Sequence, residues 1–279
     1  MDLKGKRFLI TGANTGIGRV TAEELARKGA HVYLACRSEE KTRPVLEGIL
    51  AAGGTAHFLP LDLAELASVR RCGQAYLATG EPLHGLINNA GLAGAGGSTR
   101  DGFEMTFGTN HLGHFLLTTL LLPCLRRSAP ARIVNVSSIA HFKATGIDWD
   151  ALRRPQRTTT GLAEYEVSKL CNVLFTKELA RGRAGAGVTS YALHPGVVAS
   201  DVWRRIPWPV RPAIKLFMKS NEEGAATTLH CATAPELAAH DGRYYDDCKE
   251  RPASPLSDDA ALARSLWEKS EAWVQSGAS

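Results

Sequence analysis

Arg7-Phe8-Leu9-Ile10-Thr11-Gly12-Ala13-Asn14-Thr15-Gly16-Ile17-Gly18 places a short apolar run directly before a cluster of glycines. Residues 19–28 continue as an amphipathic helix, so the order is strand, glycine turn, helix. Glycines in this context let the backbone approach a pyrophosphate, and the start of the helix offers free N–H groups. The spacing is Gly-x3-Gly-x-Gly, and the alternative is an ordinary glycine-rich turn. We predict a dinucleotide-binding turn formed by Gly12, Asn14, Thr15, Gly16, Ile17 and Gly18.

Segments typical of strands and helices alternate along the whole chain. The predicted strands cover residues 7–10, 30–36, 55–61, 85–88, 132–136, 188–193 and 242–245. The predicted helices cover residues 19–28, 39–52, 66–78, 103–125, 162–181, 222–232 and 260–273. This alternation predicts an α/β fold, a doubly wound Rossmann domain with a mostly parallel sheet of about seven strands. No linker or repeat divides the sequence, so we expect residues 1–279 to form a single domain.

Composition bears on the class of protein. The chain has 279 residues, of which 44% are hydrophobic, so it can bury a full core. Its net charge of +5 is spread without a block of like charge, which argues against nucleic acid binding. Six cysteines are scattered without a Cys-x-x-Cys pair. This pattern indicates reduced thiols and no metal site.

Two stretches bear on membranes and on the substrate. The longest apolar run, residues 115–125, is too short to cross a bilayer, and no signal peptide precedes the first strand. We therefore expect no integral membrane span and a cytoplasmic location. Residues 202–219 mix tryptophans and aliphatic side chains with basic residues, which fits a lid over an apolar substrate (about 200–220) or a patch for peripheral membrane association. Three prolines interrupt any continuous helix there and favour the lid.

The residues that follow the second and third strands bear on the choice of cofactor. Arg37 follows the second strand, where an acidic residue would hold the ribose hydroxyls of NAD. A guanidinium instead matches a 2′-phosphate, so Arg37 points to NADP(H); the alternative is a surface arginine. Asp62, followed by Leu63, is expected to cap the helix that starts near residue 66, to bind the adenine amine, or both.

Tyr165-Glu166-Val167-Ser168-Lys169 lies in the predicted helix over residues 162–181. Residues four apart on a helix share a face, so the Lys169 ammonium is expected to lie near the Tyr165 phenol. A fixed cation lowers the pKa of a phenol and so makes it an acid–base group near neutral pH. The alternative is that both side chains merely share a solvated face.

Polar residues recur at other strand ends and inside one apolar helix. Ser138 follows the strand over residues 132–136, at the edge where open α/β sheets bind ligands. Asn110 lies within an apolar helix and must find hydrogen-bonding partners, either as a structural centre or as part of a water-holding site. The segment Asn88-Asn89-Ala90-Gly91 closes the fourth strand and can also be read as a simple turn.

These motifs, in this order, resemble those of the short-chain dehydrogenase/reductase family. The resemblance covers essentially the whole chain and rests on the glycine turn, Asn88-Asn89-Ala90-Gly91, Asn110, Ser138, Tyr165-x3-Lys169 and Pro195-Gly196. The segments at residues 10–18, 110–115, 133–138 and 194–198 look like the retinol dehydrogenase branch, as does the gap of 27 positions between Ser138 and Tyr165.

The resemblance implies roles for individual residues. Tyr165 would be the catalytic acid–base, and Lys169 would lower its pKa and hold the nicotinamide ribose. Ser138 would bind the substrate oxygen, and Asn110 would hold a water that relays protons to Lys169. Asn89, Ala90 and Gly91 would take part in binding the cofactor. The wall beside the nicotinamide would be formed by Pro195, Gly196 and Val198.

The family then implies an activity. We expect an NADP(H)-dependent oxidoreductase that interconverts a lipophilic alcohol and its aldehyde or ketone, similar to a retinol dehydrogenase. A tailoring ketoreductase of a secondary metabolite or steroid-like ketone is the first alternative, and a non-catalytic NADP(H)-binding sensor is the second. The family often pairs through the helices predicted at residues 103–125 and 162–181, which suggests a homodimer.

Overall fold

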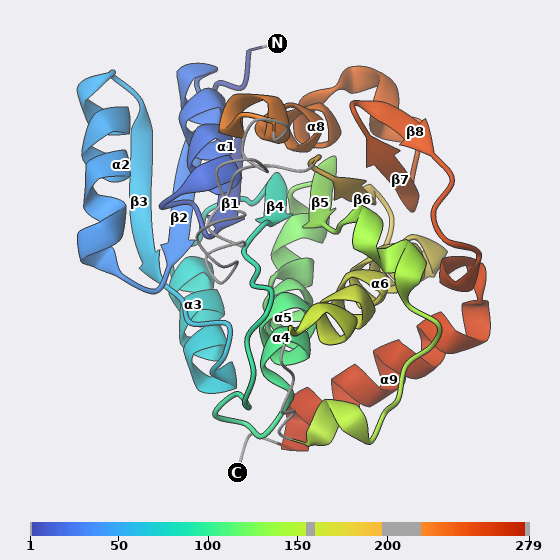
Figure 1. The fold of residues 1–279 in the computed structure, drawn as a ribbon. Coiled ribbons are helices and arrows are strands. Elements are labelled where there is room, and N and C mark those ends of the chain that lie inside the picture. Colours follow the sequence, from blue (N-terminus) through green and yellow to red (C-terminus); the bar gives the residue numbers. More distant parts are fainter. Residues whose placement is uncertain (1, 155–159, 197–218, 277–279) are drawn as a thin grey trace.

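The central sheet is built from eight strands among the described residues (2–154, 160–196 and 219–276) of the computed structural model, in the order β3-β2-β1-β4-β5-β6-β7-β8 (Figure 1). The strands are β1 (Arg7–Thr11), β2 (His31–Cys36), β3 (Thr55–Pro60), β4 (Gly85–Asn88), β5 (Ala131–Val136), β6 (Val188–His194), β7 (Arg243–Asp246) and β8 (Lys249–Arg251). Strands β1 to β7 are mutually parallel, whereas β8 runs antiparallel to β7. The predicted count of about seven strands missed β8, because all three residues of its Lys-Glu-Arg sequence are exposed and show no apolar alternation.

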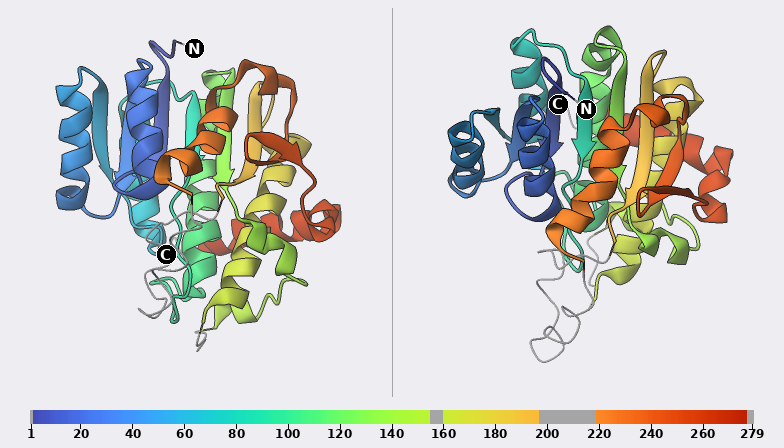
Figure 2. Two further views of the ribbon diagram at one scale, coloured as in Figure 1. Left: turned by 45° about the horizontal axis from the view of Figure 1, so that its top comes forward. Right: turned by 90° about the horizontal axis from the view of Figure 1, so that it is seen from above.

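Helices cover both faces of the sheet, as expected for a doubly wound fold (Figure 2). One face carries α1 (Gly16–Arg27), α2 (Glu39–Ala51) and α8 (Asn221–Thr233). The other carries α3 (Leu66–Ala78), α5 (Gly113–Arg127) and α6 (Leu162–Glu178). Helix α8 begins with a capping box, in which the Ser220 hydroxyl accepts from the Glu223 N–H and the Glu223 carboxylate accepts from the Ser220 N–H. Short helical turns also occur between these elements: η2 (Ile139–Lys143), η3 (Ala151–Arg153), η6 (Pro235–Ala239) and η7 (Pro255–Asp258).

The two large hydrophobic cores follow the alternation of the strands. Leu9 and Tyr33 point into the layer that contains α3, α5 and α6. Phe8, Ile10 and Val32, which are their neighbours along the strands, point into the layer that contains α1 and α8. Successive residues of a strand face opposite sides of the sheet, so a strand buried on both sides has an almost continuous apolar sequence.

Two long helices differ from their predicted form. The predicted helix over residues 103–125 consists of α4 (Met105–Phe107), the π-helical segment η1 (Gly108–Leu112) and α5. The predicted helix over residues 162–181 ends as α6 at Glu178, and η4 (Leu179–Arg183) follows, with Gly182 at a φ of 116°. A π-helical turn contains an extra residue, and periodicity alone does not reveal it.

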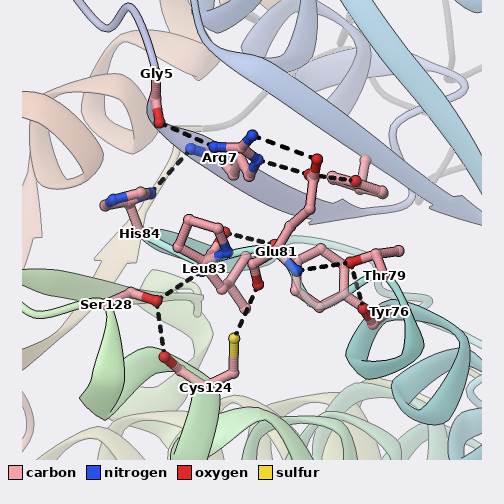
Figure 3. Close-up of polar contacts among 11 residues, drawn as sticks. Gly5, Arg7, Tyr76, Thr79, Glu81, Leu83, His84, Cys124 and Ser128 are labelled. Carbon is pink, nitrogen blue, oxygen red and sulfur yellow. Dashed lines mark hydrogen bonds and ion pairs between the residues drawn. The ribbon is translucent and has the colours of Figure 1, made fainter.

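A polar cluster lies at the amino ends of β1 and β4 (Figure 3). The predicted site residues follow the carboxyl ends of the strands, at the opposite edge of the sheet. The Arg7 guanidinium forms a two-pronged ion pair with Glu81, with Nε 2.6 Å from Oε2. The Tyr33 hydroxyl donates to the same carboxylate at 2.7 Å, and the His84 Nδ1 accepts from the Arg7 backbone N–H at 3.1 Å. These contacts fasten β1, β2 and the segment before β4 to one another.

Helix α9 (Ala260–Ser276) lies across α6 and also contacts α5. The Trp267 ring meets Phe115 of α5 at 4.9 Å and Phe175 of α6 at 5.7 Å between centroids. The Ser270 hydroxyl is 3.1 Å from His111 Nε2 of the π-helical segment. Helix α9 therefore covers part of the α5 and α6 surface, and the expected pairing of two chains through these helices stays a prediction. Among the described residues, every helix falls short of the length and apolarity that a membrane span requires.

Candidate active site

The glycine turn between β1 and α1 forms the first wall of the site. Gly12 and Gly16 have left-handed φ angles of 67° and 56°, which glycine adopts at little cost. A Cβ on Gly18 would lie 2.4 Å from Gly12 O and 2.4 Å from Asn89 Nδ2. No side chain caps α1 and no acidic residue lies in its first turn, so its N–H groups and dipole can receive an anion. Asn14, Thr15 and Ile17 lie in the same turn, as predicted.

The turn after β4 is tied to the end of β1. The Thr11 Oγ1 accepts from the backbone N–H groups of Asn89 (3.0 Å) and Ala90 (2.9 Å). Asn89 Nδ2 donates to Thr11 O at 2.8 Å. These bonds hold the Asn89–Gly91 turn beside the glycine turn at the point where the strand order reverses, which is where doubly wound folds bind nucleotides.

The predicted catalytic residues come together at the carboxyl end of β5. Tyr165 and Lys169 of α6 are 8% and 3% exposed, and Ser138, directly beyond β5, is 8% exposed. Lys169 Nζ donates to Val136 O at 2.9 Å and lies 5.5 Å from the centre of the Tyr165 ring. A Cβ on Gly91 would lie 3.5 Å from Lys169 Nζ, so the turn after β4 reaches this group.

Burial governs the ionisation of both residues. Burial raises the pKa of Tyr165 above its ordinary value, and hydrogen bonding with the Ser138 hydroxyl acts in the opposite direction. Burial also lowers the pKa of Lys169 to about 8. In this geometry the Lys169 ammonium donates to Val136 O and lies 5.5 Å from the centre of the Tyr165 ring. The expectation that Lys169 lowers the pKa of Tyr165 stays a prediction.

Asn110 lies in the π-helical segment and is fully buried. Its Oδ1 accepts from Leu92 N (2.9 Å), and its Nδ2 donates to Leu92 O (2.9 Å) and to Ser168 Oγ (3.0 Å). The side chain thus clamps the segment after Gly91 to α6, one turn from Tyr165. These contacts fit the structural alternative weighed for Asn110, and its water-holding role stays a prediction.

The residues expected at the adenosine end lie beyond β2 and β3. Arg37 is exposed directly after β2, with its guanidinium accessible at the carboxyl edge. Asp62 does not cap α3, because Glu65 is the N-cap residue and the Leu66 N–H donates to Asp101 Oδ2 at 2.9 Å. Asp62 Oδ1 instead accepts from Ala64 N at 3.0 Å, within the turn that also contains the buried Leu63.

The segment expected to line the nicotinamide begins at the end of β6. Pro195 and Gly196 follow His194 there, and Gly196 has a φ of 88°. Val198 and almost all of the predicted lid at about 200–220 lie outside the described residues. The cofactor role of Val198 and the lid therefore stay predictions.

One buried group at the site was not singled out from the sequence. His114 Nδ1 lies 3.0 Å from Asn110 O and its Nε2 lies 2.9 Å from Thr11 Oγ1. A carbonyl only accepts, so Nδ1 carries the proton and Nε2 accepts from the Thr11 hydroxyl. Burial lowers the His114 pKa to about 4, which keeps the ring neutral. The only sequence signal for it was a histidine inside an apolar helix.

The sequence profile of the family described as short chain dehydrogenase matches residues 6–149. Two curated relatives are each 46% identical over 97% of this chain and 86% of their own length: retinol dehydrogenase 12 from Mus musculus and retinol dehydrogenase 11 from Homo sapiens. The chain belongs to the short-chain dehydrogenase/reductase family. Within it, the sequence is retinol dehydrogenase-like.

A solved structure shares the fold of this chain. The Pseudomonas aeruginosa RhlG/NADP active-site complex is 28% identical, with a TM-score of 0.72 over 88% of this chain and 95% of its own. The predicted doubly wound fold is therefore confirmed. The chain is an oxidoreductase that acts between an alcohol and its carbonyl compound, with a cofactor of the NAD(P) class.

Proposed function

We propose that this protein is an NADP(H)-dependent oxidoreductase that interconverts a lipophilic alcohol and its aldehyde or ketone, as a retinol dehydrogenase does. The observation that carries the proposal is the burial of Ser138, Tyr165 and Lys169 together at the carboxyl end of β5, beside the Gly91 turn. A cofactor-binding scaffold has no need of a buried phenol and hydroxyl side by side. This arrangement favours turnover over the sensor alternative.

The turn between β1 and α1 is suited to hold the cofactor. Gly12 and Gly18 leave no room for a Cβ against Ala90, Asn89 and the turn's own backbone, as close packing beside a pyrophosphate requires. When bound, NADP(H) supplies or accepts the hydride. The phosphates would be held by the start of α1, and the nicotinamide would lie near Gly91 and Pro195.

The chain's own residues carry out the proton transfer. In the reductive direction, Tyr165 gives its phenolic proton to the substrate oxygen, and Ser138 holds that oxygen by a hydrogen bond. A neutral phenol, favoured by its raised pKa, is the correct acid for this step. Lys169 stabilises the phenolate once the proton has left, and Asn110 supports the return of a proton through water. In the oxidative direction Tyr165 acts as the base.

The substrate class is supported by apolar side chains around the catalytic pair. Five large hydrophobic side chains among the described residues are exposed, and three of them flank the site: Ile139 at 53%, Phe142 at 46% and Leu162 at 46%. Ile139 follows Ser138 directly, and Leu162 lies one helical turn before Tyr165. Water-exposed apolar groups gathered at a catalytic centre suit a lipophilic substrate.

The preference for NADP(H) rests on Arg37, which is exposed at the carboxyl end of β2 where no acidic residue stands. An Arg37→Asp variant is expected to shift catalytic efficiency from NADPH toward NADH, because a carboxylate repels a 2′-phosphate and binds ribose hydroxyls. An unchanged ratio of the two efficiencies would remove Arg37 from cofactor selection.

The proposal as a whole is tested by NADPH consumption against a panel of carbonyl compounds. Retinal, medium-chain aldehydes and steroid ketones are offered side by side. Turnover of retinal or long aldehydes supports the proposal. Turnover of bulky ketones alone favours the tailoring ketoreductase, and NADPH binding without turnover of any compound favours the sensor.

A further inference from the structure

His141 is fully buried in the turn that follows β5, three residues after Ser138. It belongs to η2, a short helix for which Ser138 is the N-cap residue. The helix packs against α6, which carries Tyr165. The Ser138 hydroxyl accepts from Ala140 N at 3.2 Å, so the side chain and the backbone of Ser138 are both engaged by this turn.

Both nitrogens of the His141 ring have partners. Nδ1 lies 2.7 Å from the Ser138 backbone oxygen, and Nε2 lies 3.0 Å from the Ser254 backbone nitrogen. A carbonyl oxygen only accepts and a backbone N–H only donates. Nδ1 therefore carries the proton and Nε2 is the acceptor, so the ring is neutral in one tautomer. Burial lowers the pKa of His141, which agrees with a neutral ring.

Neighbouring rings fix the orientation of the imidazole. The His141 centroid lies 4.3 Å from that of Phe142 and 4.8 Å from that of Tyr244 on β7. A buried ring with both nitrogens engaged has no free lone pair or proton to offer a substrate. His141 is thus unsuited to proton transfer, and its contacts lead to the backbone of Ser138 instead.

We propose that His141 is a positioning residue that fixes Ser138 through its backbone carbonyl and anchors it to the segment after β8. The inference rests on the proposed function, in which the Ser138 hydroxyl holds the substrate oxygen. A hydroxyl placed by a rigid backbone keeps its geometry during turnover, and small displacements of such groups reduce the rate strongly. The expected effect is therefore on kcat rather than on cofactor binding.

Two variants separate the two hydrogen bonds of the ring. His141→Asn places an amide nitrogen near the position of Nδ1 and keeps the bond to Ser138 O. His141→Gln reaches the position of Nε2 and keeps the bond to Ser254 N. Each variant loses one bond, so comparable falls in denaturation midpoint are expected from both.

Their activities should differ. With NADPH and the panel carbonyl that the wild type reduces fastest, His141→Gln should lower kcat at least tenfold and leave the KM for NADPH within about twofold. His141→Asn should retain at least about a third of the wild-type kcat. Equal losses of kcat in both variants, or an unchanged kcat in His141→Gln, would show that the ring serves stability alone and overturn the proposal.

A double-mutant cycle with Ser138→Ala tests whether His141 acts through Ser138. In the Ser138→Ala background, His141→Gln should change kcat by less than about twofold. Independent, multiplicative losses would overturn the proposal. A Ser138→Ala variant with wild-type kcat would instead remove the role of Ser138 itself, and with it this inference. The single variant thus reports on the proposed function separately.

Discussion

Gly18→Ala tests how tightly the cofactor turn is packed. The added Cβ would lie 2.4 Å from Gly12 O and 2.4 Å from Asn89 Nδ2, whereas ordinary contacts begin at 3.4 Å. The start of α1 must therefore move by about 1 Å relative to the turns after β1 and β4. Overpacking of this kind costs roughly 1–3 kcal/mol of folding stability.

The same displacement should weaken cofactor binding. The N–H groups at the start of α1 would be displaced from the pyrophosphate that they are proposed to bind together with the Gly12 turn. We therefore expect the Kd for NADPH to rise at least about tenfold, which is a loss of roughly 1.4 kcal/mol in binding free energy. Fluorescence titration measures Kd, and urea denaturation measures the free energy of unfolding.

Gly48→Ala is the matched control. Gly48 is exposed inside α2, and a Cβ there meets nothing within 4 Å. Alanine should stabilise this helix by roughly 0.5–1 kcal/mol and leave NADPH binding unchanged. If Gly18→Ala bound NADPH within twofold of the wild type and unfolded at the same urea concentration, the packing argument for the turn would be refuted.

The remaining predictions concern the apolar rim and acid stability. The double variant Phe142→Ala/Leu162→Ala should lower kcat/KM for decanal about tenfold more than for propanal, because the longer chain loses contact with two half-exposed apolar side chains. Leu50→Ala, which removes a similarly exposed leucine on α2, is the control. Equal effects of the double variant on both aldehydes would contradict the role of Phe142 and Leu162 in substrate binding. Burial and the nearby Lys6 and Arg7 lower the pKa of His84 to about 4. Because the folded state binds this proton less readily than the unfolded state, the contribution of His84 to folding stability is complete above about pH 6.5 and is lost as the pH falls toward 4. After discounting for partial exposure, the loss is about 1–2 kcal/mol. The His84→Asn side chain still accepts from Arg7 N but does not titrate in this range. As the pH falls from 7 to 4.5, the variant's free energy of unfolding in urea should therefore improve relative to that of the wild type. A difference that does not change with pH would contradict the role of His84 in acid stability.

Much of the fold could be read from local sequence signals. The parallel strands are buried on both faces and stand out as apolar runs, and the ends of α3 and β4 were predicted as the structure has them. The site residues around Ser138, Tyr165 and Lys169 are brought together by strand order and helix periodicity, which both follow from the sequence.

The structure differs from the sequence-based prediction where side chains interact with partners that are distant along the chain. Asp62 has the residue type of an N-cap, yet Asp101 receives the Leu66 N–H. In the π-helical segment, the Asn110 side chain is hydrogen-bonded to Leu92 and Ser168, which are distant along the chain. The pKa of Tyr165 depends on burial, which the spacing of Tyr165 and Lys169 does not report.

The placement of α9 is the largest of these differences. Its amphipathic sequence predicts a helix but not which surface it covers. Trp267 packs against Phe115 and Phe175 on the face through which we expected two chains to pair. The expected homodimer, with its pairing surface, stays a prediction.

The measurement that tests the central claim most directly is the turnover of Tyr165→Phe. Phenylalanine keeps the buried ring and removes only the proton that the substrate oxygen receives. With NADPH and the best carbonyl of the panel, kcat should fall by about 10²-fold or more. The Kd for NADPH should stay within about twofold of the wild type. A variant that kept more than about a third of the wild-type kcat would contradict the assignment of Tyr165 as the acid–base of this enzyme.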